Sequence, residues 1–569
     1  MNNSNLHYQF IDRTAAQRYK QVGAWSKHIL YDYLAAHADA HPDREAIVDP
    51  PNAQTLFNLD AERLTWQELR VRVDVIAHEL LAQGIGHGDV VMVQLGNSWI
   101  AVACLFAITK LGAIVSPLSL QSRLAELDHA LDALEPTAYI GGTFFRGFNH
   151  ANYFRQSFPN FAGEIIEVED LINASAQERG HKETLQGNPV SADDIATICW
   201  TSGTEGKPKA VPRTHNNWRA SALGVSDGFG MGDKPERIML PFPLINTAAI
   251  GGVTMPWLNN GGTLVLHHPF DIDIFCRQVV DERVSATLAS PPVLQAMLSS
   301  DIIRQAGKAL NLKAVGCGSA APSIPLLQHY EEQLGISIIN MFGANEGTLL
   351  CSDRTLIPDA ERRSSHFPRV GYAHVTWPNR AANWLQSKLI DPVTGEEIDG
   401  DDSAGVLAVK GPSIFPGYYY RGQFNRSCFT ADGFYITGDL FQIAKDDEGP
   451  RLLKVIGRQK ELVIRGGYNI SPLEVDLALA DLPGAREFAT AGISDPVYGE
   501  RLCLYVVNEP GAKISLQDVQ THLSRQGLAK TKWPERLVSV TELPRNALNK
   551  VVRSRLKDAA LADDVCDDG

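Results

Sequence analysis

The sequence lacks paired cysteines and an excess of positive charge, and each absence excludes a class of protein. Its 569 residues include eight cysteines, and no two are spaced as a CxxC redox motif or a zinc framework. Scattered thiols favour a reducing cytoplasm, which is the location we expect. The formal net charge of −14 argues against a nucleic-acid partner, because non-specific nucleic-acid binding requires clustered Lys and Arg.

A long apolar run is also missing. The most apolar stretch, residues 99–118, is interrupted by Lys110, Gly112 and Pro117, so we expect a buried helix followed by a strand and no membrane span. The first twenty residues are polar and of mixed charge, unlike a signal peptide. With 44% apolar and 21% charged residues, the composition is typical of a globular protein.

Apolar runs alternate with helical runs along much of the chain. The alternation covers residues 88–141 and returns over 237–343. Continuous apolar strands between helices are typical of parallel sheets that are covered on both faces. The sequence therefore predicts an α/β fold with two doubly wound sheets, over about 25–235 and 236–365.

The pattern changes in the last third of the chain. Between about 366 and 456, turn-rich segments separate short strands, which indicates an antiparallel β region. Short helix and strand units then follow, which favours a small, mobile α+β domain. We expect an N-terminal domain over 1–456 and a C-terminal domain over 457–569.

The stretch CWTSGTEGKPKAVPRTH, residues 199–215, combines hydroxyls, glycines and lysines. It is not a Walker A loop, because Gly206 and Lys207 are followed by Pro208, which has no hydroxyl for magnesium. Inward-turned backbone N–H groups, hydroxyls and lysines can nevertheless form a concave anion site. A solvated loop between a strand and a helix is the other interpretation, and composition alone does not choose between them.

A second glycine motif, GCGSAA at residues 316–321, matches the G-x-G-x-x-A spacing of a dinucleotide fingerprint. The acidic residues that would bind a ribose, Glu331 and Glu332, come too early and inside the following helix. A plain strand-to-helix turn is therefore preferred to a nicotinamide site.

Four further stretches gain meaning from their order. They are NMFGANEG at 340–347, YITGDL at 435–440, GRQKELVIRGGYNISPLEVD at 457–476 and LPRNALNKVVRSRL at 543–556. Together with TSGTEGKPKA, this series closely resembles the adenylate-forming superfamily of acyl-CoA synthetases, aryl-acid AMP ligases, peptide-synthetase adenylation domains and luciferase. The resemblance runs from about residue 25 to 557.

The resemblance implies an AMP-forming ligase that activates a carboxylic acid as acyl-AMP, releases pyrophosphate and transfers the acyl group to the thiol of coenzyme A. It implies ATP, Mg²⁺ and coenzyme A as cofactors and assigns a role to individual residues. The implied catalytic residues are Lys550, which would bridge the substrate carboxylate and the α-phosphate, Glu346, which would bind the metal, and Thr204. The implied ATP-binding residues are Thr201, Ser202, Gly203, Thr204, Gly206 and Lys209 in the phosphate loop, Ser319, Ala320, Ala321 and Phe342 around the adenine, and Asp439 and Arg458 at the ribose. Gly343 and Asn345 are also implied to bind ATP.

The same resemblance implies a hinge at Lys460 and a thiol-side loop at Arg465, Gly466 and Gly467, although Gly-Gly is also an ordinary hairpin signal. The form IRGGYNISPLEVD is similar to that of CoA ligases, whereas PRTHNNW is similar to siderophore aryl-acid ligases, which load the phosphopantetheine of a carrier protein. The His-Asn pair expected of the latter after RIMLPFPL is missing. CoA is the first expectation and an acyl carrier protein the second; a homodimer stays open.

The expected substrate pocket is small and apolar. Its members are Leu244, Asn246, Thr247, Gly316, Cys317, Phe342, Gly343 and Leu349. No cation is available among them for the carboxylate of an α-amino acid, and no acid for its amine, so we expect an apolar carboxylic acid as the substrate. Ordinary core packing is the other interpretation of the apolar members.

Three positions depart from the family pattern. Glu205 replaces the usual threonine and puts a negative charge beside phosphates, Asn345 replaces a threonine, and Asn549 replaces the glycine before Lys550. A relative that binds adenylate with weakened catalysis therefore remains a third hypothesis.

Overall fold

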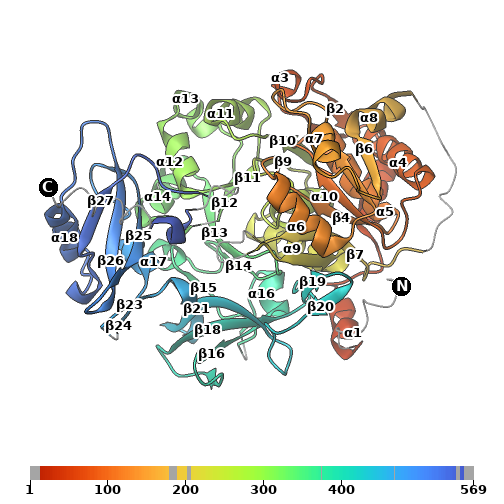
Figure 1. Cartoon of the computed structure of the whole chain (residues 1–569). Coiled ribbons are helices and arrows are strands. Elements are labelled where there is room, and N and C mark those ends of the chain that lie inside the picture. Colours follow the sequence, from red (N-terminus) through yellow and green to blue (C-terminus); the bar gives the residue numbers. More distant parts are fainter. Residues whose placement is uncertain are drawn as a thin grey trace.

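The computed structural model describes residues 13–177, 189–201, 207–318, 320–372, 375–466, 468–545 and 551–556. Within these ranges the strands form four sheets (Figure 1). Two of these sheets have eight strands each, and a six-stranded and a five-stranded sheet follow toward the C-terminus.

The first sheet has the strand order β20-β19-β8-β7-β4-β3-β5-β6. Its strands are β3 (Val90–Gln94), β4 (Ile114–Pro117), β5 (Ala138–Gly141), β6 (Glu164–Glu167), β7 (Ile195–Trp200), β8 (Ala210–Thr214), β19 (Tyr418–Tyr420) and β20 (Gln423–Asn425). The strands from β7 to β6 pair in parallel, whereas β8 and β19 are added antiparallel. Every residue of β3, β4 and β5 is buried, which explains their continuous apolar runs.

The second sheet has the order β14-β13-β12-β11-β9-β10-β1-β2. Its strands are β1 (Glu45–Val48), β2 (Arg63–Thr65), β9 (Arg237–Leu240), β10 (Thr263–Leu266), β11 (Ala286–Ala289), β12 (Ala314–Cys317), β13 (Ser337–Gly343) and β14 (Leu349–Ser352). The edge strands β2 and β14 are antiparallel to their neighbours, and the other pairings are parallel.

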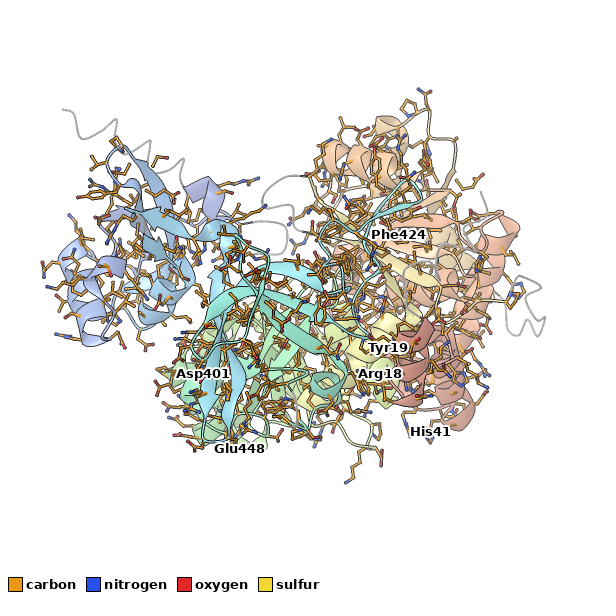
Figure 2. The ribbon with its side chains drawn as sticks, turned by 90° about the horizontal axis from the view of Figure 1, so that it is seen from below. Arg18, Tyr19, His41, Asp401, Phe424 and Glu448 are labelled. Atoms are coloured by element: carbon orange, nitrogen blue, oxygen red, sulfur yellow. The ribbon has the colours of Figure 1, made fainter. Side chains whose placement is uncertain are left out.

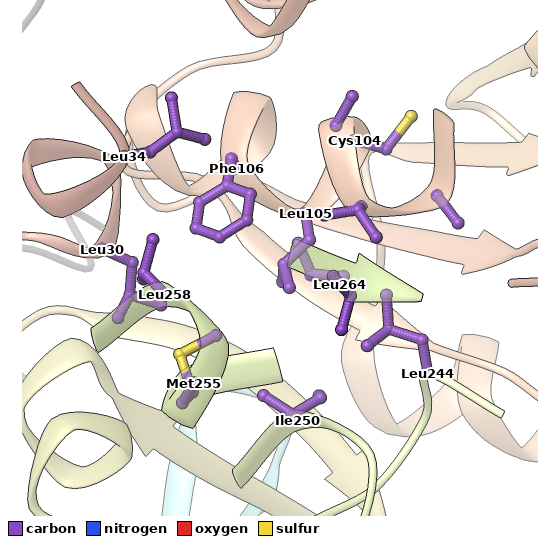
Figure 3. Packing of buried hydrophobic residues seen from close by; sticks show 14 of the residues in the cluster. Leu30, Leu34, Cys104, Leu105, Phe106, Leu244, Ile250, Met255, Leu258 and Leu264 are labelled. Atoms are coloured by element: carbon purple, nitrogen blue, oxygen red, sulfur yellow. The ribbon is translucent and has the colours of Figure 1, made fainter. Parts of the chain in front are cut away.

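The main core lies between these two sheets. Its helices are α2 (Leu30–Ala40), α4 (Trp66–Ala82), α5 (Trp99–Lys110), α8 (Val168–Gln177), α9 (His215–Gly228), the π-helix η2 (Ile250–Thr254) and α10 (Met255–Asn260). Figure 3 shows Leu105 and Phe106 of α5 facing Leu258 of α10 and Leu264 of β10. Helix α1 (Arg13–Gln21) packs on α9, and the short α3 (Ala53–Phe57) forms its own small cluster.

Outer helices cover the far faces of both sheets. On the first sheet they are α6 (Leu124–Leu134) and α7 (His150–Ser157). On the second they are α11 (Ile272–Asp281), α12 (Pro291–Ser299), α13 (Asp301–Ala306), η3 (Gly307–Ala309), α14 (Ile324–Gln328) and the π-helix η4 (His329–Leu334). The GCGSAA stretch leads from β12 toward α14, as a strand-to-helix turn.

The antiparallel region is a six-stranded sheet of order β15-β22-β21-β18-β16-β17. Its elements are α15 (Ala360–Arg363), β15 (His366–Pro368), α16 (Arg380–Trp384), β16 (Gln386–Ile390), β17 (Glu397–Ile398), β18 (Ala404–Lys410), β21 (Tyr435–Asp446) and β22 (Gly449–Arg458). In Figure 2, Asp401 and Glu448 mark the turns at its outer end, while Phe424 of β20 lies apart from them beside the N-terminal half.

The C-terminal part has its own five-stranded sheet, in the order β24-β23-β26-β25 with β27 added to β26. Its elements are η5 (Gln459–Glu461), β23 (Val463–Arg465), β24 (Tyr468–Ile470), α17 (Pro472–Ala478), β25 (Ala485–Asp495), β26 (Gly499–Asn508), α18 (Leu516–Arg525), η6 (Lys530–Lys532) and β27 (Arg536–Ser539). Figure 1 shows it as the blue lobe beside the rest of the chain. The boundary at 456/457 stays a prediction; β22 ends at Arg458.

The α/β fold class is confirmed, and residues 99–118 form helix α5 and strand β4 as expected. Among the described residues, no helix is long and apolar enough to cross a membrane. The sheets divide the chain less simply than the alternation suggests. Strands β1 and β2 lie in the range expected for the first sheet but pair in the second, and β19 and β20 return from the β region to complete the first.

Candidate active site

The base of the expected phosphate loop is closed by a pair of hydrogen bonds. Strands β7 and β8 form an antiparallel pair in which Trp200 faces Ala210. Just beyond it, the Thr201 N–H donates to the Lys209 carbonyl at 3.0 Å, and the Lys209 N–H donates to Thr201 Oγ1 at 2.9 Å. The loop therefore joins two antiparallel strands, and the helix expected directly after it begins only beyond β8. Ser202, Gly203, Thr204, Glu205 and Gly206 lie outside the described residues.

The side chain of Lys209 leads from this loop to the predicted metal ligand. Its Nζ atom lies 4.6 Å from the centre of the Tyr418 ring, a cation–π contact. The Tyr418 hydroxyl in turn donates to Oε1 of Glu346 at 2.7 Å and lies 3.5 Å from the Tyr435 hydroxyl. Burial, and then the Glu346 charge, raise the pKa of both phenols well above its ordinary value. Both therefore remain protonated at neutral pH.

A tight turn holds Glu346, whose surface is only 7% exposed. The Phe415 N–H donates to the Glu346 carbonyl at 2.9 Å, and the Ser413 hydroxyl donates to the Gly347 carbonyl at 2.7 Å. Gly347 has φ +100°, and a Cβ there would lie 1.9 Å from the Ser413 carbonyl oxygen. Only glycine fits at this close approach of two backbone segments.

The predicted ribose residues face each other on neighbouring strands. Asp439 of β21 and Arg458 of β22 are cross-strand partners, and Arg458 Nε lies 2.9 Å from Asp439 Oδ1. Burial opposes the charge of Arg458, but the carboxylates of Asp439, Glu461 and Glu346 together raise its pKa above the ordinary value. The ribose pair and Glu346 therefore share one electrostatic environment.

The predicted adenine-side residues are only partly described. The Phe342 ring meets the ring of Phe441, a residue of the same strand as Asp439, edge to face with centroids 5.1 Å apart. Ala320 is exposed and Ala321 is half-buried at the end of the β12 turn. Ser319 lies outside the described residues.

Most of the predicted pocket residues gather near the carboxyl ends of β12 and β13. Gly343 pairs with Leu349 across β13 and β14. A Cβ on Gly316 would meet Leu288 Cδ2 at 2.4 Å and Met341 Sδ at 2.8 Å, so these two side chains fill the space beside it. Leu244 belongs to the same core cluster as Leu288.

Three other pocket residues have different roles. The Thr247 N–H donates to Oδ1 of Asn345 at 2.8 Å, which ties this segment to the Glu346 turn. Oδ1 of Asn246 accepts from the backbone of Ala248 and Ala249 and so caps the turn before η2. Cys317 is fully buried among the outer helices, and its side chain lies on the face of β12 opposite the one beside Gly316. The prediction that Cys317 lines the same pocket as Gly316 is therefore corrected.

Arg465, of the predicted thiol-side loop, contacts residues of the C-terminal lobe. Arg465 donates to the carbonyls of Thr531 and Trp533 and lies 3.3 Å from a Glu535 carboxylate oxygen. Gly466, at φ +56°, begins the hairpin turn between β23 and β24. Lys460 lies in η5. Gly467, Asn549 and Lys550 fall outside the described residues, although the bridge between Arg545 and Val551 flanks the Lys550 loop.

Sequence reasoning missed Tyr418, Tyr435 and Arg213. Tyr418 begins an aromatic run after Pro416 and Gly417, and Tyr435 is the first residue of YITGDL. The signal for Arg213 was a charged residue inside an otherwise apolar strand, in the stretch PRTHNNW.

Comparison with known proteins gives the family. The model of the AMP-binding enzyme family matches residues 34–419, and the model of the AMP-binding enzyme C-terminal domain matches residues 474–550. The chain belongs to the AMP-binding enzyme family. The predicted superfamily and the predicted class of enzyme, an AMP-forming ligase of carboxylic acids, are confirmed.

Similar proteins cover nearly the full length. A salicylyl-CoA synthase / salicylate adenylyltransferase of Streptomyces sp is 29% identical, over 96% of this chain and 96% of that protein. Enterobactin synthase component E of Escherichia coli (strain K12) is 29% identical, over 95% of this chain and 96% of that protein. The solved structure of ATP-bound MatB from Rhodopseudomonas palustris matches with a TM-score of 0.77 and 25% identity, covering 94% of this chain and 99% of that one. These matches support ATP as the nucleotide substrate.

Proposed function

We propose that this ligase joins an apolar carboxylic acid to AMP, releases pyrophosphate, and then transfers the acyl group to the thiol of coenzyme A. The observation that carries the proposal is a chain of contacts around one site. Lys209 meets Tyr418, Tyr418 donates to Glu346, and the pair of Asp439 and Arg458 shares the electrostatic environment of Glu346. A cation, a carboxylate and the pair proposed to bind the ribose would together meet the needs of ATP.

The donor set fits magnesium. No group of three or more His, Cys, Asp or Glu side chains that could hold a metal occurs within the described ranges. Mg²⁺ at nucleotide sites takes only one or two protein carboxylates and completes its shell with water and substrate phosphates. Glu346, buried and held by one phenol, can supply that single carboxylate, and bound Mg²⁺ would neutralise phosphate charge.

The first reaction brings two anions together. A carboxylate oxygen of the acid attacks the α-phosphorus, the new C–O–P link forms, and the bond to the β-phosphate oxygen breaks as pyrophosphate departs. No protein nucleophile is needed. The proposed task of Lys209, the phosphate loop and Lys550 is to stabilise the charge that develops in this transition state.

The acid is proposed to be apolar. Leu288 and Met341 lie against Gly316, Leu349 lies against Gly343, and Leu244 belongs to the same core cluster as Leu288. None of the described residues proposed for this pocket is a cation or a carboxylate. An α-amino group or a second carboxylate would lose its hydration without a partner, which disfavours such acids.

The second reaction needs a thiol. We propose that the C-terminal lobe turns about Lys460 between the two steps, that the hairpin at Gly466 then lies beside the entry path of the thiol, and that CoA is the acceptor. A salicylyl-CoA synthase among the relatives supports CoA. Enterobactin synthase component E supports the other candidate, the phosphopantetheine thiol of a carrier protein. No disulfide joins any of the seven described cysteines, which supports the expected cytoplasmic location.

Pyrophosphate release with a panel of aliphatic, alicyclic and aryl acids tests the first step, and the same panel with CoA or with a phosphopantetheinylated carrier tests the second. We expect pyrophosphate with apolar acids only, and acyl-CoA when CoA is present. Pyrophosphate without acyl-CoA would refute the CoA assignment. No pyrophosphate with any acid would favour a relative that binds adenylate without turnover.

The role of Lys550 needs a separate experiment. Lys550→Ala should abolish pyrophosphate release while sparing thioester formation from chemically supplied acyl adenylate, because the lysine is proposed to act in the first step only. An equal loss of both reactions would refute this role.

A further inference from the structure

A buried arginine that the proposed mechanism does not use lies behind the Glu346 turn. Arg213 on β8 has no exposed surface, and its guanidinium lies 4.2 Å above the Trp218 ring. No carboxylate within the described ranges forms an ion pair with it. Burial lowers the pKa of Arg213 to about 10, against the smaller opposing effects of Cys199 and Glu346, so the group still carries its charge at neutral pH.

The guanidinium contacts neutral oxygens instead. Nη1 donates to the Asn345 carbonyl at 2.9 Å, and Nη2 donates to the Asn217 carbonyl at 3.1 Å and to Ser221 Oγ at 2.8 Å. Its Nε atom has no partner in the described part of the chain. A charge removed from water without a counter-ion is costly, and a neutral residue of the same size would fill the space at lower cost.

Asn345 connects this cation to both substrate-binding segments. Its Nδ2 donates to the Trp200 carbonyl at 2.8 Å, directly before the phosphate loop, and its Oδ1 accepts the Thr247 N–H at 2.8 Å. A threonine, the usual residue here, has one side-chain oxygen where the amide offers a separate donor and acceptor. The Asn345 side chain therefore joins the start of the phosphate loop to the Thr247 segment.

We infer that Arg213 is a positioning residue. Through the Asn345 carbonyl it fixes the turn that carries Glu346, between the phosphate loop and the Thr247 segment that is proposed to bind the acid. Its charge also lies close enough to Glu346 for the two to interact. The carboxylate is thus held from two sides, by the Tyr418 hydroxyl at its oxygen and by Arg213 at the backbone one residue earlier. The inference rests on the proposed role of Glu346 as the magnesium ligand.

The test compares Arg213→Met, Arg213→Lys and Arg219→Met. Arg219 is the matched control, because it lies on the adjoining α9 and also donates to backbone carbonyls, those of Gly23 and Ala24, but has no contact with Asn345. Arg213→Lys restores the charge and one donor toward Asn345. Thermal unfolding of each variant reports the purely structural cost.

The readouts are kcat for pyrophosphate release, the Mg²⁺ concentration for half-maximal rate, and the Kd of ATP by calorimetry with Mg²⁺ and with EDTA. We expect Arg213→Met to lower kcat by about 10–100-fold and to raise the Mg²⁺ requirement, as loss of a group supporting a metal ligand does. The KM for the acid should change little. Arg213→Lys should regain a large part of the kcat that Arg213→Met loses. Arg219→Met should lose stability but keep its kcat and Mg²⁺ requirement.

Several results would overturn the inference. One is an Arg213→Met variant with the wild-type Mg²⁺ requirement and kcat, and another is equal losses in Arg213→Met and Arg219→Met. If the wild-type chain releases no pyrophosphate, the proposed function fails, and the calorimetry still decides. Arg213→Met should then remove the Mg²⁺-dependent gain in ATP affinity while ATP binding in EDTA is unchanged; an unaltered gain would refute the inference.

Discussion

Replacing Gly347 with alanine gives the sharpest test of the Glu346 turn. The new Cβ would lie 1.9 Å from the Ser413 carbonyl oxygen and 2.7 Å from its carbon, and backbone atoms cannot rotate away as a side chain can. The turn must move. Moving it breaks two hydrogen bonds, of about 1 kcal/mol each, and the left-handed φ adds about 1 kcal/mol of strain. Their sum, about 3 kcal/mol, corresponds to about a 100-fold loss in rate if it falls on the transition state.

The assay is kcat/KM for pyrophosphate release, with chemical unfolding measured in parallel. Gly422→Ala is the matched control, because Gly422 has φ +75° in the β19–β20 turn and nothing within 4 Å of its added Cβ. The control should lose about 1 kcal/mol of stability and keep its activity. If Gly347→Ala retains the kcat/KM of Gly422→Ala, the turn does not hold Glu346 in the way described.

Three further predictions follow from other contacts. Tyr418→Phe removes the donor to Glu346 and should raise the Mg²⁺ concentration for half-maximal rate about tenfold, measured by metal titration; an unchanged titration would contradict the contact. Gly316→Ala pushes Leu288 into the pocket and should raise KM for bulky acids more than for small ones, as a substrate panel would show. Burial raises the pKa of Asp49 to about 7. Between about pH 4 and 7 the folded state therefore binds more protons than the unfolded state. The free energy of unfolding should fall as pH rises through this range, by up to about 1.4 kcal/mol per pH unit. Urea unfolding of Asp49→Asn should lose this slope.

The sequence predicts the elements of this fold better than their pairing. Strands β3 and β4 and helix α5 can be predicted from the sequence, because the hydrophobic pattern of a strand or helix depends only on neighbouring residues. The return of β19 to the edge of β8 is a contact between residues about two hundred positions apart. Nothing in the hydrophobic pattern of either strand encodes which sheet it joins.

The candidate site divides in the same way. Motifs in a fixed order predict Glu346, Asp439 and Arg458; Asp439 and Arg458 form an ion pair, and the charge of Glu346 contributes to the raised pKa of Arg458. Arg213 was missed because a single buried cation leaves no periodic signature. Cys317 was placed in the pocket although strand alternation sends its side chain to the face opposite Gly316, a signal that was present in the sequence.

The position of β19 late in the sequence affects how the first sheet can fold during synthesis. Chains emerge from the ribosome N-terminus first, and domains generally fold as units during synthesis. The first sheet receives β19 and β20, the two strands at one end of its order, only when residues 418–425 have been synthesised, long after its central strands. Tyr418 comes with them, so a nascent chain that stops short of β19 lacks the hydroxyl that holds Glu346. The contact between Tyr418 and Glu346 can therefore form only after the central strands of both large sheets have been synthesised.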